Sequence, residues 1–170
     1  MIVLKSLNTD QLKKKEIIEI CILKNTFWKF GLDSNILWFK KNIKKTDVHN
    51  LLYLKSELAG YTLLRNRSVF LNNSKQKYLY FDTLIIKKKF RNRKLSKILM
   101  NFNNDIIVSK KKHSILMCNN KLISFYKKFY WRVVNKKMIT ISDHKFSDYI
   151  IMNFNAVKIK YIKTKYYLNK

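Results

Sequence analysis

The sequence predicts an α/β fold, and three observations support this prediction. In the second half, short apolar runs and amphipathic stretches follow one another in the order strand, helix, strand, helix, strand. Residues 78–86 are apolar enough to form a strand in the middle of a sheet. Residues 95–107 repeat apolar side chains at intervals of three and four, which indicates a helix packed on that sheet. We therefore expect a sheet that is covered by helices.

The composition fits a folded single domain with a strong positive charge. The 170 residues are 47% hydrophobic, which excludes a disordered polycation. With 37 Lys and Arg against 10 Asp and Glu, the net charge of +27 raises nucleic acid or an anionic membrane as a partner. Lys, Asn and Ile dominate together, however, as an AT-rich coding sequence would produce at exposed positions. The charge alone therefore does not decide between coding bias and a polyanion-binding surface.

The first 47 residues predict one strand and two helices. Residues 2–5 favour a short opening strand, and the apolar spacing of residues 10–24 and 34–43 favours helices. Side chains that can cap these helices precede them: Thr9 and Asp10 for the first helix, and Asp33 or Ser34 for the second.

From His49 onward the pattern becomes extended. Residues 51–55 and 58–64 predict an antiparallel hairpin, and the polar residues 66–77 predict a loop or another hairpin. Further elements are expected in this order: the strand 78–86, the helix 95–107, a strand over 114–118, a helix over 122–129, and strands over 131–134 and 149–154. Beyond Ala156 apolar residues alternate with lysine, so the tail is expected to be an added strand, a dimer contact or a disordered end.

The turn between the strand 78–86 and the helix 95–107 has the sequence RNRKLS. The start of such a helix presents unpaired backbone N–H groups and the positive end of its dipole, which suit a pyrophosphate. The turn resembles the R-x-x-G-x-G or R-x-x-G-x-A signature of GNAT acyltransferases, because Arg91 and Leu95 match. Lys94 replaces the first glycine and Ser96 replaces the second. A lysine there could add a charge-assisted contact to a phosphate.

A second segment strengthens this resemblance. Asn119 stands seven residues before Tyr126, and Trp131 follows, as in the later GNAT pattern of a strand, an Asn and a helix ending in F-Y-x-x-x-G-[FW]. Tyr130 stands where that pattern has glycine. The hairpin around Gly60 is also similar to a recurrent turn of the family. Two ordered segments at family-like separation are more specific than one, so the chain resembles the GNAT N-acetyltransferases.

The resemblance covers about residues 50–154 and implies a fold in detail. We expect a single domain with a mixed, mostly antiparallel central sheet of six or seven strands and helices on both faces. A V-shaped opening would separate two parallel strands that end near Ile86 and Cys118. The domain would have three parts, which are a helical acceptor-side region, a sheet and cofactor core, and a basic tail or extra strand: residues 1–47, 48–154 and 155–170.

The resemblance also implies transfer of an acetyl or other acyl group from acetyl-CoA to the primary amine of a small acceptor. The aromatic ending after Tyr126 looks like that of the aminoglycoside and amino-sugar branch, which suggests such a ring as acceptor. The implied cofactor-binding residues lie on the central strand, in the turn and after the next strand: Leu84, Ile85, Ile86, Arg91, Arg93, Lys94, Leu95, Ser96, Lys97 and Asn119. No metal is expected.

Three residues are candidates for the proton transfers. Tyr126 matches the family tyrosine that donates a proton to the departing thiolate, and a phenol pKa of ~10 suits that acid. The alternative for Tyr126 is a buried aromatic whose hydroxyl bonds to backbone. Asp82 on the cofactor strand and Glu57 at the hairpin turn are candidate bases for the ammonium proton, and either carboxylate could instead be structural.

Other residues carry weaker signals. His49 could line the acceptor site or be a hydrogen-bonded core residue. Aromatic residues of the N-terminal region could stack on a sugar or pack in the core: Trp28, Phe30, Trp38 and Phe39. Cys21 and Cys118 lie in apolar runs without metal-ligand spacing, so we expect buried thiols.

The N-terminus lacks the pattern of a signal peptide, and no run approaches the ~18 apolar residues of a membrane span. We therefore expect a cytoplasmic protein, as a monomer or homodimer. Two other functions stay open. One is an acyltransferase for a protein or peptide amine. The other is a non-enzymatic nucleic-acid-binding protein that uses the lysine surface and two arginine pairs: Arg65 with Arg67, and Arg91 with Arg93.

Overall fold

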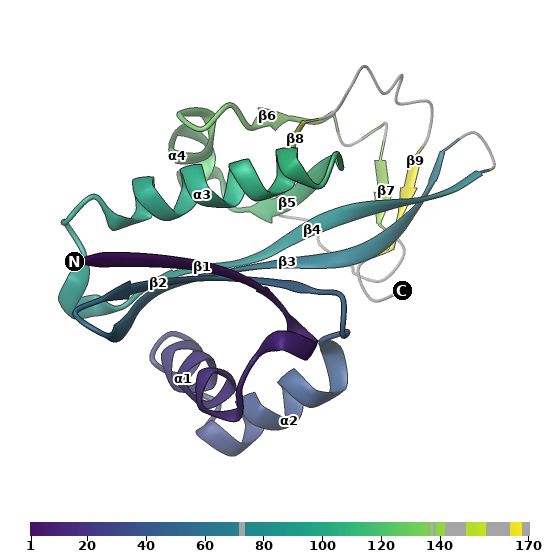
Figure 1. Cartoon of the computed structure of the whole chain (residues 1–170). Coiled ribbons are helices and arrows are strands. Elements are labelled where there is room, and N and C mark those ends of the chain that lie inside the picture. The colour runs from purple at the N-terminus through teal and green to yellow at the C-terminus, as the bar shows by residue number, and fades with distance from the viewer. Residues whose placement is uncertain (72–73, 136, 138, 142–148, 156–163, 168–170) are drawn as a thin grey trace. The chain divides into compact units, whose positions relative to one another are not determined.

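The computed structural model describes residues 1–71, 74–135, 137, 139–141, 149–155 and 164–167 (Figure 1). The strands are β1 (Ile2–Asn8), β2 (Val48–Leu54), β3 (Glu57–Leu71), β4 (Ser74–Ile86), β5 (Ser114–Cys118), β6 (Arg132–Val133), β7 (Ile139–Ile141), β8 (Ile150–Phe154) and β9 (Thr164–Tyr166). The helices are α1 (Lys14–Asn25), α2 (Leu32–Asn42), α3 (Leu95–Ser109) and α4 (Ile123–Lys127), with short 3₁₀ turns at Thr9–Gln11, Lys88–Phe90 and Asn120–Leu122.

The predicted α/β fold with a mixed, mostly antiparallel sheet is confirmed. The strands follow the order β1-β2-β3-β4-β5-β8-β6, and β4 and β5 form a parallel pair that aligns Leu79 with Ser114 and Phe81 with Leu116. The expected number of six or seven strands was too low. The short strands β7 and β9 add a second parallel pair beside β3. The strand β7 was not predicted, because three residues are too few to show an apolar period, whereas β9 lies in the tail for which an added strand was one of the expectations.

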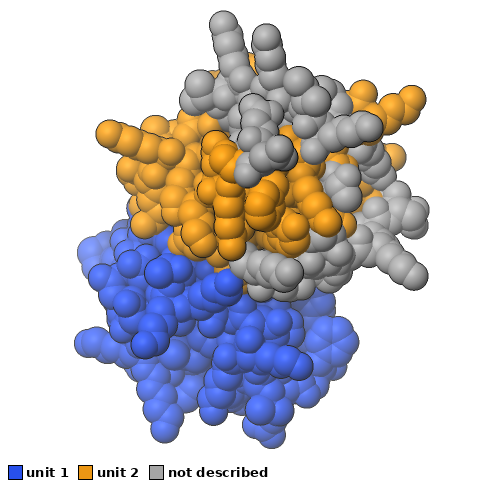
Figure 2. Space-filling model, turned by 90° about the vertical axis from the view of Figure 1, so that its right-hand side faces the viewer, with its two compact units in different colours: residues 1–65, 83–103 blue, residues 66–82, 104–170 orange. Residues whose placement is uncertain are grey.

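The chain divides into two compact units, which Figure 2 colours separately. The first unit comprises residues 1–65 and 83–103, and the second comprises residues 66–82 and 104–170. The elements β3, β4 and α3 each contribute to both units.

In the first unit the strands have an apolar core on each face, because successive side chains of a strand point to opposite sides. One face packs against α1 and α2 (Figure 1), in a core formed by Ile20, Cys21, Leu23, Phe39, Leu51, Leu58, Tyr61, Leu63 and Ile85. The other face packs against the first half of α3, in a core formed by Leu52, Ala59, Leu95 and Leu99 with Leu84 and Ile86 beside them. Helices therefore cover both faces, as predicted.

The start of α1 differs from the prediction. Thr9 and Asp10 lie in a 3₁₀ turn, and α1 begins at Lys14. The backbone N–H of Lys13 donates to Oε2 of Glu16 at 3.0 Å, which satisfies an N–H at the start of the helix. The Thr9 hydroxyl instead donates to the Lys44 carbonyl at 2.7 Å. Thr9, which was predicted to cap α1, therefore makes a tertiary hydrogen bond instead.

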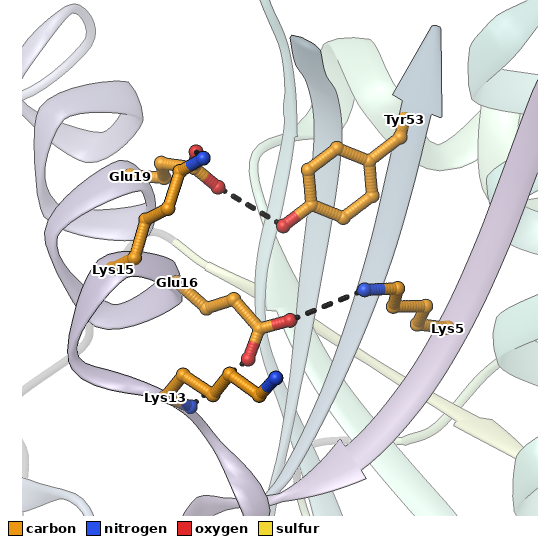
Figure 3. A network of polar contacts seen from close by, with 6 residues as sticks. All are labelled: Lys5, Lys13, Lys15, Glu16, Glu19 and Tyr53. Atoms are coloured by element: carbon orange, nitrogen blue, oxygen red, sulfur yellow. Dashed lines mark hydrogen bonds and ion pairs between the residues drawn. The ribbon is translucent and has the colours of Figure 1, made fainter. Parts of the chain in front are cut away.

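A polar network fastens α1 to the first two strands (Figure 3). The Tyr53 hydroxyl donates to Oε2 of Glu19 at 3.0 Å, and Nζ of Lys5 donates to Oε1 of Glu16 at 3.4 Å. Burial and the bond to Glu19 raise the pKa of the Tyr53 phenol, so the hydroxyl keeps its proton at neutral pH. The network fixes the helix relative to the β1–β2 edge.

The second unit has its own core around β4, β5, β8 and β9. Its buried members are Val69, Tyr78, Tyr80, Ile115, Val134, Ile139, Ile151 and Tyr166. On the neighbouring side, Nε1 of the buried Trp131 donates to Oδ1 of Asn104 at 3.1 Å, and Nδ2 of Asn104 donates to the Phe129 carbonyl at 3.0 Å. These bonds join α3 to the segment after α4.

Residues 66–77, predicted as a loop or a hairpin, form the outer part of the β3–β4 hairpin. Arg67 is fully buried on β3, where Nη1 donates to the Asn66 carbonyl at 2.7 Å. Of the two predicted alternatives the structure therefore has the hairpin, and a buried, hydrogen-bonded guanidinium lets this polar sequence form a strand. Of the predicted C-terminal tail, residues 156–163 and 168–170 lie outside the described residues.

None of the helices in the described part of the chain is long and apolar enough to cross a membrane.

Candidate functional site

Residues 87–97, here called the cationic loop, connect β4 to the first turn of α3 in the first unit. Seven of these eleven residues are Lys or Arg and none is acidic. The backbone N–H groups of residues 93–96 donate to no backbone carbonyl among the described residues. The N–H of Lys97 does have an acceptor, the Lys94 carbonyl at 3.0 Å, so it is already satisfied. The loop therefore offers consecutive free N–H groups and many cations, the features that bind phosphates.

Two residues stand where the GNAT patterns have glycine, and both adopt the glycine-like conformation. Lys94 has φ of 57° and Tyr130 has φ of 65°. Asn92 in the same loop has φ of 62°. Left-handed backbone is unfavourable for residues with a Cβ, by roughly 1–2 kcal/mol. Lys94 and Tyr130 therefore adopt backbone that is usual for glycine, at a cost in conformational energy.

Glu57 anchors the beginning of the cationic loop. Its Oε1 lies 2.5 Å from Nζ of Lys87, and its Oε2 lies 2.6 Å from Nζ of Lys89. The N–H of Lys87 also donates to the Ala59 carbonyl at 2.8 Å. Hydrogen bonds from Lys87 and then Lys89 lower the pKa of the Glu57 carboxyl. The carboxylate is therefore ionised at neutral pH and both of its oxygens are engaged.

Arg91, the first residue of the predicted signature, contacts two other segments of the same unit. Its Nε donates to the Ile86 carbonyl at 3.3 Å, and its guanidinium lies 5.3 Å from the ring centre of Phe27. Arg93 lies 5.8 Å from the ring centre of Phe90 in the same way. The arginines thus pack on aromatic rings, while their side chains stay exposed to solvent.

The other predicted cofactor-binding residues of this unit differ in exposure. Leu95 and Ile85 are buried in opposite apolar cores, so only their backbone could meet a ligand. Leu84, Ile86 and Ser96 are half-buried. A Cβ added at Gly60 would lie 2.8 Å from Cδ1 of Ile86 and 3.1 Å from Cδ2 of Leu99, so glycine allows β3 to approach β4 and α3 closely.

Tyr126 belongs to the second unit, on α4, and is 8% exposed. Its ring packs edge-on against Phe81 at 6.2 Å and against Trp131 at 6.3 Å. Its hydroxyl has no hydrogen-bond partner among the described residues, so the alternative of a hydroxyl bonded to backbone does not hold there. Burial, with a smaller contribution from Cys118, raises the pKa of the phenol. A protonated hydroxyl without a protein partner is available to a ligand.

Asn119 and Asp82 also belong to the second unit. Oδ1 of Asn119 accepts from the N–H of Lys121 at 3.0 Å, so this side chain caps the 3₁₀ turn after β5. Asp82 is half-buried on β4, next to Phe81, whose ring contacts Tyr126. Cys118 is buried at the end of β5, where its Sγ lies 3.9 Å from Sδ of Met152.

His49 is a core residue of the first unit. Its ring lies between Phe39 and Tyr61, with centroids at 5.5 and 5.9 Å, and its nitrogens contact the hydroxyls of Thr9 and Tyr61, both at 2.8 Å. Burial, with a smaller contribution from Lys24, lowers the pKa of His49 to about 3. The ring is fully enclosed and neutral, so of the two predicted alternatives the structure favours the hydrogen-bonded core residue.

The N-terminal aromatic residues divide into two groups. Phe39 is buried, whereas the side chains after α1 are exposed: Phe27 54%, Trp28 37% and Phe30 73%. Lys24 is buried, which no sequence pattern indicated, and its Nζ lies 3.7 Å from the ring centre of Trp38. A lysine at the end of a helix looks like a solvated charge, and only the fold brings Trp38 against it.

Within the described residues, no group of three or more His, Cys, Asp or Glu side chains could hold a metal ion.

No family model matches the sequence, and no curated protein sequence matches it. Solved structures do match. Escherichia coli ElaA superposes with a TM-score of 0.66 at 16% identity, over 90% of this chain and 99% of that one. Arabidopsis thaliana Naa50, in complex with the bisubstrate analogue CoA-Ac-MVNAL, gives 0.61 at 18% identity, over 90% and 97%. An aminoglycoside 6′-N-acetyltransferase complexed with coenzyme A gives 0.65 at 11% identity, over 91% and 98%.

Proposed function

The chain has the fold of the GNAT N-acetyltransferases, and on that premise we propose that it transfers an acyl group from acyl-CoA to a primary amine. The observation that carries the proposal is Tyr126, a buried tyrosine whose hydroxyl has no partner among the described residues. It stands at the position where the GNAT pattern has its tyrosine. The cationic loop, with its free N–H groups and its lysines and arginines, suits the diphosphate and 3′-phosphate of CoA.

In the proposed reaction the amine nitrogen attacks the thioester carbonyl carbon. The new N–C bond forms, the C–S bond breaks, and an amide and a thiol result. Tyr126 donates its proton to the departing sulfur, and Asp82 is our candidate for the base that accepts the ammonium proton. The backbone of Leu84, Ile85 and Ile86 would pair with the pantetheine. Burial raises the pKa of the phenol, so the proton is present at neutral pH when the sulfur departs.

The acceptor that we propose is a small primary amine. The exposed aromatic side chains of Phe27, Trp28 and Phe30 offer rings on which a sugar or another ring can stack. The solved structures that resemble this chain include an aminoglycoside 6′-N-acetyltransferase, and also Naa50 with the bisubstrate analogue CoA-Ac-MVNAL. A protein or peptide amine therefore remains the second candidate.

An assay of acetyl-CoA-dependent thiol release tests the proposal against both acceptor classes. Amino sugars and aminoglycosides form one panel, and short peptides with free N-termini form the other. We expect release of CoA thiol with members of the first panel. Release with peptides alone would replace the small acceptor by a peptide, and no release with any amine would contradict acyl transfer to amines.

A further inference from the structure

We propose that Glu57 is a positioning residue, which holds the cationic loop in the arrangement that receives the phosphates of CoA. This inference rests on the proposed function, because it assigns the loop to CoA. It gives Glu57 a role different from that of a base in the proton transfer. The reasons are the position of the carboxylate, its two partners and the charge of the loop.

The hairpin turn before β3 fixes the position of Glu57. Lys55 and Ser56 both have left-handed backbone, with φ of 49° and 65°, as in the two-residue turns that join antiparallel strands tightly. Glu57 is the first residue of β3, and Ala59 two residues later accepts the N–H of Lys87. The backbone bond and the two ion pairs therefore join the same two short segments.

The loop needs a counter-charge at this place. It contains Lys87, Lys88, Lys89, Arg91, Arg93, Lys94 and Lys97 without an acidic residue. Glu57 supplies a carboxylate that pairs with two of its lysines, Lys87 and Lys89. It engages one lysine with each oxygen, so its single charge offsets half of the charge of Lys87 and Lys89, and the other five cations are left for a ligand. Without it, like charges would repel one another at the beginning of the loop.

The same contacts make Glu57 unsuited to proton transfer from an ammonium group. A general base works best when its pKa lies near the working pH. The ion pairs with Lys87 and Lys89 lower the pKa of this carboxyl. Both oxygens also bond to lysine Nζ atoms, so an approaching ammonium group would share the carboxylate with two cations.

Calorimetric titration with CoA, together with acetyl-transfer kinetics, tests this role in three variants of the full chain. Glu57→Gln removes the charge, and Glu57→Asp keeps the charge but shortens the reach to two lysines. Glu19→Gln is the matched control, because Glu19 lines the same cavity of about 300 Å³ as Glu57 but bonds to Tyr53 instead of the loop.

We expect both Glu57 variants to raise the dissociation constant of CoA and the KM for acetyl-CoA by about three- to tenfold, the scale of two partly exposed ion pairs. The kcat at saturating acetyl-CoA and the acid limb of the pH profile of kcat/KM should stay as in the wild type. Glu19→Gln should bind CoA as the wild type does.

Unchanged or tighter CoA binding in Glu57→Gln would overturn the positioning role, since loss of a negative charge by itself favours a polyanion. A loss of kcat of about a hundredfold or more, with loss of the acid limb, would overturn it in favour of a base. If Glu57→Gln does not fold, Glu57→Asp decides in the same way. A wild-type chain that does not bind CoA would contradict the proposed function, which is a separate result.

Discussion

At the scale of single residues, Lys94 and Tyr130 have strained, left-handed backbone. Lys94 and Tyr130 replace glycines of the GNAT patterns and still have positive φ. The sequence shows that neither residue is glycine, but it does not show which φ each residue adopts, because φ depends on the surrounding fold. Both positions thus have backbone that is usual for glycine, and each carries the conformational strain of a residue with a Cβ.

Tyr130→Gly should stabilise the protein. Tyr130 is 82% exposed, so its side chain gives up little contact, whereas glycine removes the cost of left-handed backbone. We expect the free energy of unfolding to rise by about 0.5–1 kcal/mol after the larger chain entropy of glycine in the unfolded state is included. Urea unfolding of the wild type and the variant measures this change in free energy. Tyr130→Ala is the control, because alanine keeps the Cβ, and equal effects of both changes would contradict the strain.

Tyr126→Phe should slow the acyl transfer by a factor of about 10²–10⁴, which is typical for loss of a general acid. The hydroxyl has no partner among the described residues, so its removal breaks no protein hydrogen bond and stability should be unchanged. The kcat of acetyl transfer from pH 6 to pH 9 and thermal unfolding check the two expectations. An unchanged kcat at every pH would remove Tyr126 from the acid role.

At the scale of elements, apolar periodicity predicted the parts that pack on the sheet. The strand β4 and the helix α3 were expected at residues 78–86 and 95–107, and the structure has them at Ser74–Ile86 and Leu95–Ser109. Their cores are built from residues such as Leu95 and Leu99, whose spacing is visible in the sequence. The short strand β7 depends on its pairing with the distant β9, and it was not predicted.

In the candidate site, too, local features could be predicted from the sequence and long-range contacts could not. Arg91 and the free N–H groups follow from the local turn, which the sequence reveals. The ion pairs of Glu57 join residues 30 positions apart, and no local pattern marks them. The exposed Phe27 under Arg91 is another long-range contact. The sequence therefore reveals the basic turn but not the ion pairs that join it to Glu57.

The attachment of α1 to the sheet is testable through Tyr53. Tyr53→Phe removes the hydrogen bond to Glu19 and leaves the carboxylate without this donor (Figure 3). We expect a loss of about 1 kcal/mol in the free energy of unfolding, measured in urea, because Glu19 keeps some contact with solvent. Tyr130→Phe removes an exposed hydroxyl and serves as the control. Equal stability of Tyr53→Phe and the wild type would show that the network does not hold α1.

At the scale of the whole molecule, the net charge of +27 includes both buried and exposed arginines. Arg65 and Arg67, one of the two arginine pairs considered for nucleic acid, are 5% and 0% exposed. They are engaged within the fold, since Nη2 of Arg65 donates to the Asn42 carbonyl at 3.2 Å. Arg91 and Arg93 are exposed, but they lie in the loop that we assign to CoA. The arginines therefore give the nucleic-acid alternative less support than the sequence suggested.

Stability should fall as the pH decreases below 6.5. Burial lowers the pKa of His49 to about 3 and that of His113 to about 4, so the unfolded chain binds protons that the folded chain does not. Stability then rises with pH in this window. From pH 6.5 to pH 4.5 we expect each histidine to cost about 2 kcal/mol. Urea midpoints across this range measure the loss, and an NMR titration of His49 near pH 6.5 would contradict the burial.

The most direct test of the whole account is a calorimetric titration of the wild-type chain with acetyl-CoA, beside one with a single-stranded RNA oligonucleotide. We expect one acetyl-CoA bound per chain, with binding that persists at 200 mM salt. RNA should bind only weakly and lose its affinity steeply as salt rises. Absence of acetyl-CoA binding, with tight binding of RNA instead, would contradict the assignment of the cationic loop and with it the proposed acyl transfer.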